Sequence, residues 1–213
     1  MTTFLFVRHG ESLANRHEIF CGQSDYDLSE KGYAQAAVTA KYIAENYQVA
    51  CVYASDLTRA FHTGEAIAEA AGCPVVADPA LREIHCGEWE EAPFGEMLTR
   101  WPDSYPAWLH DIGNVQCPGG ETVPDVLARV LPALEVLALR HENDAIAIAT
   151  HGTVIRALMC VLGGKPLSEM KNIPWNSNAS VTEFFYEDGA WRIGRVNLDG
   201  HLGDLSTRLP DTV

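Results

Sequence analysis

Short, uninterrupted apolar runs that alternate with amphipathic segments are the feature that most limits the fold of this chain. The runs cover residues 4–7, 49–54 and 145–149, and each gives way directly to polar residues. A strand buried on both faces of a parallel sheet has this composition, whereas a strand with one solvated face alternates apolar and polar residues. The runs therefore predict strands of a mainly parallel sheet.

Helical spacing fills most of the chain between these runs. Residues 28–47 are rich in alanine, and Ser29 is a plausible N-cap. Apolar residues then recur about every 3.6 positions over 57–71, before Gly72, and a further helix is expected over 153–162. Strands that alternate with helices in this way predict an α/β fold with right-handed crossovers.

A longer helix is expected after Thr122. Asp125 lies three residues further on, as in a capping box, and an apolar stripe covers residues 123–137. Pro132 lies inside that stripe. Because proline lacks the N–H that an interior helical position donates, we expect a kink or break there.

Two segments depart from the strand–helix alternation. Residues 85–120 hold three of the five tryptophans and four of the eleven prolines, which indicates a small helical cap inserted over the sheet. Two β-like runs, 181–186 and 191–196, are separated by residues 187–190 and predict a C-terminal β-hairpin. We therefore expect a three-layer α/β/α sandwich with a mainly parallel sheet, built as one domain over residues 1–213.

The charge balance limits the partners of this chain. Fifteen Lys and Arg against 29 Asp and Glu give a formal net charge of −14, which repels nucleic acid and anionic lipid. No apolar stretch approaches the roughly 18 residues that span a bilayer, and the N-terminus lacks the pattern of a secretory signal. We expect a cytoplasmic protein with no nucleic-acid or membrane partner. A small anionic substrate is compatible with this charge if the few cationic residues converge.

The cysteines and histidines do not follow the spacings of metal sites. The six cysteines form no Cys-x-x-Cys pair, and no His-x-x-x-His or Glu-x-x-His spacing occurs. Those spacings are typical of zinc sites, redox motifs and metal sites on helices. We therefore expect reduced cysteines, no metal and no cofactor.

Basic and imidazole side chains follow the three predicted strands. Arg8 and His9 come directly after the first, Ser55 follows the second with Arg59 one turn into the next helix, and His151 follows the third. Each of these alone is more often a structural or solvated residue. Because the carboxyl ends of parallel strands meet at one edge of a sheet, their joint placement instead predicts an anion site.

The segment Phe6-Val7-Arg8-His9-Gly10-Glu11-Ser12-x-x-Asn15 resembles the signature of the histidine phosphatase superfamily. This family includes cofactor-dependent phosphoglycerate mutases, fructose-2,6-bisphosphatases, broad-specificity phosphatases and α-ribazole phosphatases. Further blocks resemble the family's motifs in the same order along the chain, at residues 22–36, 55–63, 81–90, 118–122 and 150–152. The ordered series carries the resemblance, because a lone Arg-His-Gly is only a moderate signal.

The resemblance implies a covalent mechanism at His9. Its imidazole would attack phosphorus and form a phosphohistidine, although the residues alone would also fit a His9 that only binds phosphate. Arg8, Arg59 and His151 would surround the transferring phosphoryl group and stabilise the charge on its oxygens. The neutral donors that the resemblance implies are Asn15, Gly22 and Gly152.

The same resemblance gives the proton-transfer role to Glu83. Its carboxyl group would protonate the leaving alkoxide, which is too basic to depart unaided at neutral pH, and would then activate water to cleave the phosphohistidine. Glu11, Glu88, Glu90 and Glu91 are rival carboxylates in the same regions of the sequence, but Glu83 alone fits the Leu-x-Glu spacing.

The composition of the cap favours hydrolysis over a mutase reaction. A mutase must bind a second anionic group, yet residues 84–120 contain a single basic residue, Arg100, among six acidic ones. We expect a metal-independent phosphatase for a small phosphorylated metabolite, resembling the broad-specificity or α-ribazole branches. A phosphoglycerate mutase and a catalytically silent phosphate-binding module of the same fold are the alternatives, and the hairpin edge leaves a homo-oligomer open.

Overall fold

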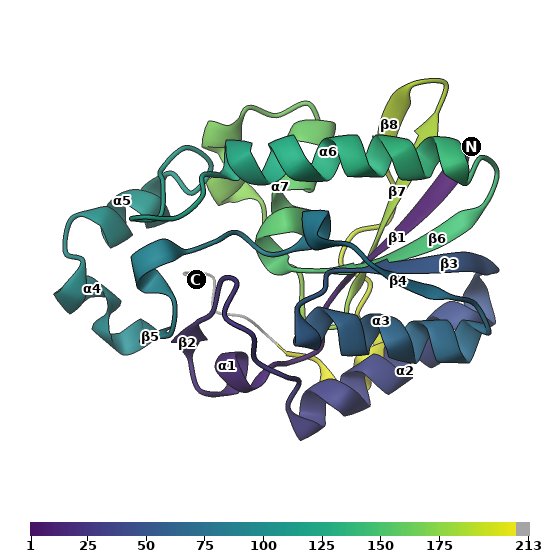
Figure 1. Ribbon diagram of the computed structural model, residues 1–213, viewed down its shortest axis with the longest axis horizontal. Coiled ribbons are helices and arrows are strands. Elements are labelled where there is room, and N and C mark those ends of the chain that lie inside the picture. The colour runs from purple at the N-terminus through teal and green to yellow at the C-terminus, as the bar shows by residue number, and fades with distance from the viewer. Residues whose placement is uncertain (208–213) are drawn as a thin grey trace.

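The computed structural model describes residues 1–207, whose main feature is a six-stranded sheet with strand order β4-β3-β6-β1-β7-β8 (Figure 1). The four strands β1, β3, β4 and β6 run parallel to one another, and β7 and β8 are antiparallel to their neighbours. The strands are β1 Thr2–Arg8, β3 Val49–Ala54, β4 Val75–Ala77, β6 Ala145–Thr150, β7 Val181–Glu187 and β8 Ala190–Ile193. The predicted mainly parallel sheet is confirmed.

Helices cover both faces of the sheet. Figure 1 shows α6 (Val123–Arg140) and α7 (Gly152–Leu162) over one face, and α2 (Glu30–Asn46) and α3 (Thr58–Ala71) over the other. Alternate residues of the central strand β1 enter the two cores: Phe4 and Phe6 join the core under α6 and α7, and Leu5 and Val7 join the core under α2 and α3. This two-sided burial explains why the sequence of β1 is apolar throughout.

The helix ends follow the expected capping chemistry. The Ser29 hydroxyl accepts the Gly32 N–H at 3.0 Å, and Thr122 and Asp125 form a capping box. Gly72 ends α3 in the left-handed conformation, with φ of 66°.

Pro132 does not break α6, so the break that was one of the two expected outcomes does not occur. The helix runs from Val123 to Arg140 with Pro132 on its exposed side. Val130 and Leu134, on either side of the proline, are fully buried against the sheet. Their burial outweighs the one backbone hydrogen bond that proline removes, and water can reach the carbonyl left without a donor.

The segment 85–120 extends away from the carboxyl edge of the sheet, at the left of Figure 1. It contains two short helices, α4 (Met97–Arg100) and α5 (Ser104–His110). Its short strand β5 (Ala92–Pro93) pairs with β2 (Ile19–Phe20), which the sequence did not predict. The Phe20 ring lies 5.6 Å from Trp89 and 5.5 Å from Trp108 between ring centroids, so aromatic packing ties this segment to the loop after β1.

The C-terminal hairpin is part of the main sheet. Asp188 and Gly189 connect β7 to β8 with positive φ values of 51° and 79°, as a two-residue hairpin turn requires. Strand β7 pairs with β1 over residues 181–186, and the short helix α1 (Leu13–Arg16) follows β1 on the chain. Within residues 1–207, no helix is both long enough and apolar enough to cross a membrane.

Candidate active site

The carboxyl ends of β1, β6 and β3 bring the predicted site residues together. Arg8 pairs in register with Thr150 of β6, so His9 and His151 leave neighbouring strands at the same level. Their ring centroids are 5.2 Å apart. Arg8, His9, Arg59 and His151 are each no more than 7% exposed. The structure therefore gathers the two guanidiniums and two imidazoles that the sequence placed at this edge.

The proton on His9 can be assigned from its surroundings. Its Nδ1 lies 2.7 Å from the carbonyl oxygen of Gly10, which can only accept a hydrogen bond. Burial, followed by the charges of Arg59 and Arg8, lowers the pKa of His9 well below its usual value, so the ring is neutral at pH 7. A neutral imidazole carries one proton, which must then be on Nδ1. The lone pair of Nε2 is left free to act as a nucleophile.

His151 forms its hydrogen bond through Nε2, whereas His9 uses Nδ1. Its Nε2 lies 2.8 Å from the hydroxyl oxygen of Ser55, which accepts the backbone N–H of Leu57 at 3.3 Å. Burial, then the nearby charge of Arg59, lowers the pKa of His151 well below its usual value. Its Nδ1 is buried and has no hydrogen-bond partner among residues 1–207. Such an atom is costly to leave unpaired, so it is suited to contact a ligand.

The two arginines are held by main-chain carbonyls. Arg8 Nη1 donates to the carbonyl of Asn176 at 2.6 Å, and Arg59 donates to the carbonyls of Ser24 and Gly22 at 2.9 and 2.6 Å. Burial lowers the pKa of Arg8 to about 10, although the charge of Glu83 opposes this effect. The arginines in residues 1–207 that form ion pairs with carboxylates are instead Arg82, Arg100, Arg129 and Arg195.

Two buried guanidiniums that form no ion pair with a carboxylate favour the binding of an anion. Uncompensated buried charge is unfavourable, and a phosphoryl group would supply the missing negative charge in a geometry that matches a guanidinium fork. The Nε of Arg8 is also buried without a partner in the described part of the chain. This electrostatic arrangement reconciles an acidic protein with an anionic ligand.

The half-buried Glu83 lies at the edge of this cluster. One carboxylate oxygen accepts the N–H of its neighbour Ile84 at 2.8 Å, and the other accepts the N–H of Thr153 at 3.1 Å. Thr153 is in the first turn of α7, directly after His151 and Gly152. The Glu83 carboxyl group is therefore tied to the same helix start that carries His151.

The rival carboxylates have other partners or lie at the surface. Glu90 accepts hydrogen bonds from the backbone N–H of Gln23 and from both the N–H and the hydroxyl of Ser24. Glu11 accepts the hydroxyl of Ser29 at 2.7 Å. The side chains of Glu88 and Glu91 are exposed.

The three predicted neutral donors occupy different positions around the cluster. Asn15 uses its carbonyl oxygen to accept the Ser12 N–H at 3.1 Å, which leaves its amide nitrogen for another contact. Gly22 has a φ of 45°, and its carbonyl binds Arg59. Gly152 begins α7 so close to the Trp175 ring that a Cβ would lie 3.1 Å from it. A side chain at position 152 would crowd the site.

A loop far along the chain completes the site, and the sequence did not reveal it. Asn178 donates from its side chain to the carbonyl of His9 at 3.1 Å and to the amide oxygen of Asn15 at 3.3 Å. The N–H of Ala179 donates to the carbonyl of Arg8 at 2.9 Å, and its φ of 56° is unusual for a residue with a side chain. Polar residues just before β7 were the available signal.

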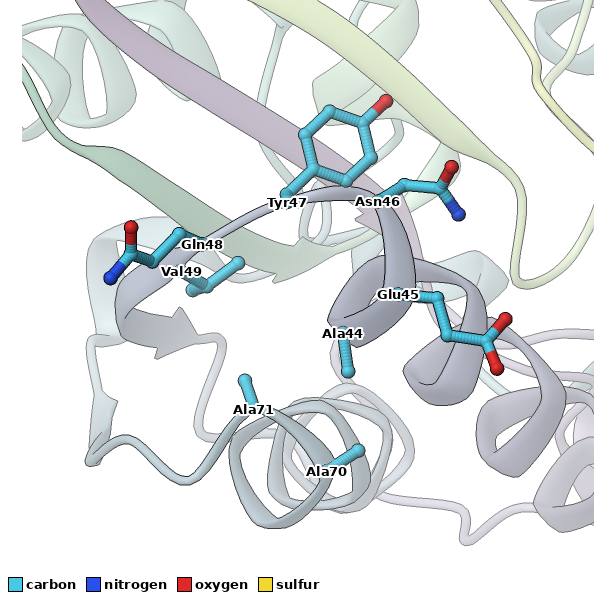
Figure 2. A pocket seen from close by; sticks show the side chains of 8 residues that line it. All are labelled: Ala44, Glu45, Asn46, Tyr47, Gln48, Val49, Ala70 and Ala71. Atoms are coloured by element: carbon cyan, nitrogen blue, oxygen red, sulfur yellow. The ribbon is translucent and has the colours of Figure 1, made fainter.

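No group of three or more His, Cys, Asp or Glu side chains in residues 1–207 is arranged to hold a metal ion. A surface groove lies at the opposite edge of the sheet, near the amino end of β3 (Figure 2). It is lined by residues 44–49 with Ala70 and Ala71 and contains no cationic side chain. The groove is therefore separate from the cluster around His9.

Two relatives from different kingdoms match nearly the whole chain. Phosphoserine phosphatase 1 of Hydrogenobacter thermophilus is 31% identical over 205 residues, which are 96% of this chain and 96% of the relative. A metal-independent phosphoserine phosphatase of Arabidopsis thaliana is 31% identical over 207 residues, covering 96% of this chain and 85% of the relative.

Family and fold comparisons agree with the motifs. The solved structure of YhfR from Bacillus stearothermophilus superposes with a TM-score of 0.87 at 30% identity, covering 95% of this chain and 100% of that one. The family model described as histidine phosphatase superfamily (branch 1) matches residues 4–199. The resemblance predicted from the sequence is confirmed: this chain belongs to the histidine phosphatase superfamily.

Proposed function

We propose that this chain hydrolyses phosphate monoesters in two phosphoryl transfers, through a covalent intermediate on His9. The single observation that carries the proposal is the neutral His9 ring, with its proton on Nδ1 and its Nε2 lone pair free, beside two buried guanidiniums without carboxylate partners. This combination supplies a nucleophile and an anion site in one place.

In the first transfer, the Nε2 lone pair of His9 attacks phosphorus in line with the ester oxygen. The phosphorus–oxygen bond breaks, its electron pair goes to the leaving oxygen, and Glu83 donates a proton to that oxygen. Arg8, Arg59 and His151 stabilise the negative charge on the equatorial oxygens, where each contact contributes about 3 kcal/mol. His151 donates from Nδ1–H, with the Ser55 hydroxyl donating to its Nε2. The free alcohol departs and the phosphohistidine remains.

In the second transfer, the Glu83 carboxylate accepts a proton from water while the water oxygen attacks phosphorus. The phosphorus–nitrogen bond breaks, and its electron pair returns to Nε2 of His9. Inorganic phosphate leaves, and the protonated Glu83 is ready for the next ester.

The proposed enzyme is metal-independent. The guanidiniums provide the positive charge that a metal ion provides in other phosphatases. The Arabidopsis relative is itself described as a metal-independent phosphoserine phosphatase, which supports the same chemistry in this chain.

The proposed substrate is a small cytoplasmic phosphate ester whose leaving group carries little negative charge. Arg100 is the single basic residue of 84–120, and it pairs with Glu96 at 3.6 Å and stacks on Trp101. It is therefore already engaged, and this argues against the second anion site of a mutase. Phosphoserine, the substrate in the names of both relatives, is the first ester to test.

Turnover of p-nitrophenyl phosphate with and without EDTA tests the reaction type. We expect equal rates, whereas activity that disappears with the chelator and returns with added metal would overturn the proposal. Absence of any turnover would instead support a silent phosphate-binding module. A panel of phosphorylated metabolites that includes phosphoserine, α-ribazole phosphate and sugar phosphates then identifies the substrate by kcat/KM.

A further inference from the structure

We propose that Arg129 is a positioning residue for Glu83, a role that rests on the proposed function of Glu83 as acid and base. Arg129 lies in the second turn of α6, on the side of the helix that faces residues 80–85. It makes no hydrogen bond to Arg8, His9, Arg59 or His151. Its hydrogen bonds therefore act through the segment that carries Glu83, although its charge also adds to burial in lowering the pKa of His151.

All five N–H groups of the Arg129 guanidinium are used. Nη1 donates to the carbonyls of Ala80 and Arg82 at 2.8 and 2.7 Å, and Nη2 donates to the carbonyl of Glu83 at 2.9 Å. The remaining two N–H groups bind the two carboxylate oxygens of Glu121 at 3.1 Å each. Only a planar guanidinium has enough donors in fixed directions to satisfy this set of acceptors.

Arg129 and Glu121 form a clamp around Glu83, because Glu121 binds the main chain on the other side of this residue. Its carboxylate accepts the N–H of His85 at 2.8 Å, and its own N–H donates to the carbonyl of His85 at 2.8 Å. Arg129 and Glu121 together therefore hold the main chain just before and just after Glu83. The Gln23 side chain, in the loop after β2, donates a further hydrogen bond to the Glu83 carbonyl at 3.0 Å.

This clamp positions Glu83 and also supports the local fold. Arg129 and Glu121 are only 21% and 24% exposed, so removal of the guanidinium leaves main-chain carbonyls and the Glu121 carboxylate short of donors and lowers the free energy of unfolding. A general acid must also lie within hydrogen-bond reach of the oxygen that it protonates, and a displacement of about 1 Å can cost about 100-fold in rate. Variants that remain folded should therefore lose proton transfer selectively.

The test compares two esters that differ in their need for an acid. O-phosphoserine releases an alkoxide that must be protonated, and p-nitrophenyl phosphate releases a stable phenolate. In Arg129→Gln we expect kcat/KM to fall about 100-fold for O-phosphoserine and less than about 3-fold for p-nitrophenyl phosphate. Arg129→Lys keeps the charge and three donors, so its kcat/KM for O-phosphoserine should fall less than that of Arg129→Gln. It should also remain folded if Arg129→Gln does not.

Two controls separate positioning from a general structural effect. Arg195→Lys removes a comparable guanidinium from the buried carboxylate of Glu183, far from Glu83, and should leave the ratio of the two kcat/KM values unchanged. The inhibition constant for inorganic phosphate should stay within about 2-fold in Arg129→Lys, because lysine keeps the charge that acts on His151.

A double variant gives the decisive comparison. Adding Arg129→Lys to Glu83→Gln should cause no further loss on O-phosphoserine, since a positioning residue has nothing left to position. Equal losses on both esters in the Arg129 variants, or additive losses in the double variant, would overturn the positioning role. Equal losses of kcat/KM, which reports only the first transfer, on both esters in Glu83→Gln alone would instead overturn the acid role itself.

Discussion

The carboxylate of Glu83 accepts a hydrogen bond from the backbone N–H of Thr153, 3.1 Å away in the first turn of α7. Thr153 lies two residues after His151, so one helix start fixes both the proposed phosphoryl ligand and the proposed proton donor. The N-terminus of a helix carries a partial positive charge, which stabilises a carboxylate while it awaits a proton from water. The distance between the acid and the phosphoryl group is thereby set by the junction of β6 and α7.

Glu83→Gln separates the two proposed roles of this carboxyl group, because proton donation and water activation belong to successive steps of the reaction. The amide keeps the shape of the side chain and can still accept the Thr153 N–H, but it cannot donate the proton or activate water as the carboxylate does. Rapid mixing with p-nitrophenyl phosphate should give a burst of nitrophenolate followed by a steady state about 100-fold slower than in the wild type. The burst arises because phosphohistidine forms normally and is then hydrolysed slowly.

The size of the burst reports directly on the covalent intermediate. Its amplitude should approach one nitrophenolate per active site. A slower steady state without any burst would show that Glu83 is needed before the phosphohistidine forms on this ester. That result would contradict the prediction that only the second transfer requires Glu83 when nitrophenolate is the leaving group.

His9→Ala should reduce turnover of p-nitrophenyl phosphate by about 1,000-fold or more, because it removes the atom that bonds to phosphorus. Quenching the wild type with base during turnover should trap a phosphohistidine that is absent from the variant. His62→Ala provides the matched control: this histidine lies one turn after Arg59 on α3, where its side chain binds Asp27 at 2.7 Å and forms no hydrogen bond with the four clustered residues. Ordinary activity in His9→Ala would reject the nucleophile assignment.

The parallel part of the fold could be predicted because its strands have a distinctive sequence pattern. A strand buried on both faces, such as β1 or β6, has to be apolar at every position, and a helix between two of them has to be amphipathic. The pairing of β2 with β5 could not be predicted, since two-residue strands carry no periodic signal. The continuity of α6 through Pro132 depends on tertiary packing that the local sequence does not contain.

The residues of the site also differ in whether a local sequence pattern marks their position. His9 and His151 could be placed together because each directly follows a predicted strand, and parallel strands end at a common edge. Asn178 and Arg129 could not be placed, because both act on main-chain carbonyls of distant segments. Any residue has such carbonyls, so the sequence of the acceptor segment gives no clue to the donor.

Gly32 illustrates a sequence requirement that only the backbone geometry explains. This residue is in the first turn of α2, and a Cβ there would lie 2.0 Å from the carbonyl oxygen of Glu11. Gly32→Ala should therefore lower the free energy of unfolding by about 2 kcal/mol or more, although alanine favours helix by about 1 kcal/mol over glycine. Gly95→Ala, where no atom lies within 4 Å of the new Cβ, should change it by less than about 0.5 kcal/mol in the same urea titration. Equal effects in the two variants would exclude the clash as the cause.

The buried histidines should make the protein less stable as the pH falls below about 6.5. The folded-state pKa values of His9 and His151 are well below the usual 6.5, chiefly because both rings are buried. The unfolded chain therefore binds protons that the folded chain rejects, and stability is lost from pH 6.5 downward toward the folded-state pKa values. These two groups together give a maximum slope of about 2.7 kcal/mol per pH unit, and His201, whose pKa is also lowered chiefly by burial, adds to the loss of stability in the same range.

Urea unfolding between pH 5 and 7.5, in buffers free of phosphate, measures this slope. Phosphate must be absent because an anion bound beside Arg8 and Arg59 would stabilise the folded state and mask the effect. In His151→Gln, which has no proton to bind in this range, the slope should fall by about 1.4 kcal/mol per pH unit. Glu183, with its pKa lowered to about 2 mainly by Arg195, contributes only at the acidic end of this window, where an unfolded glutamate begins to bind a proton, and it contributes equally in the wild type and the variant. An identical slope in the wild type and the variant would mean that His151 is protonated equally in both states, contrary to its burial.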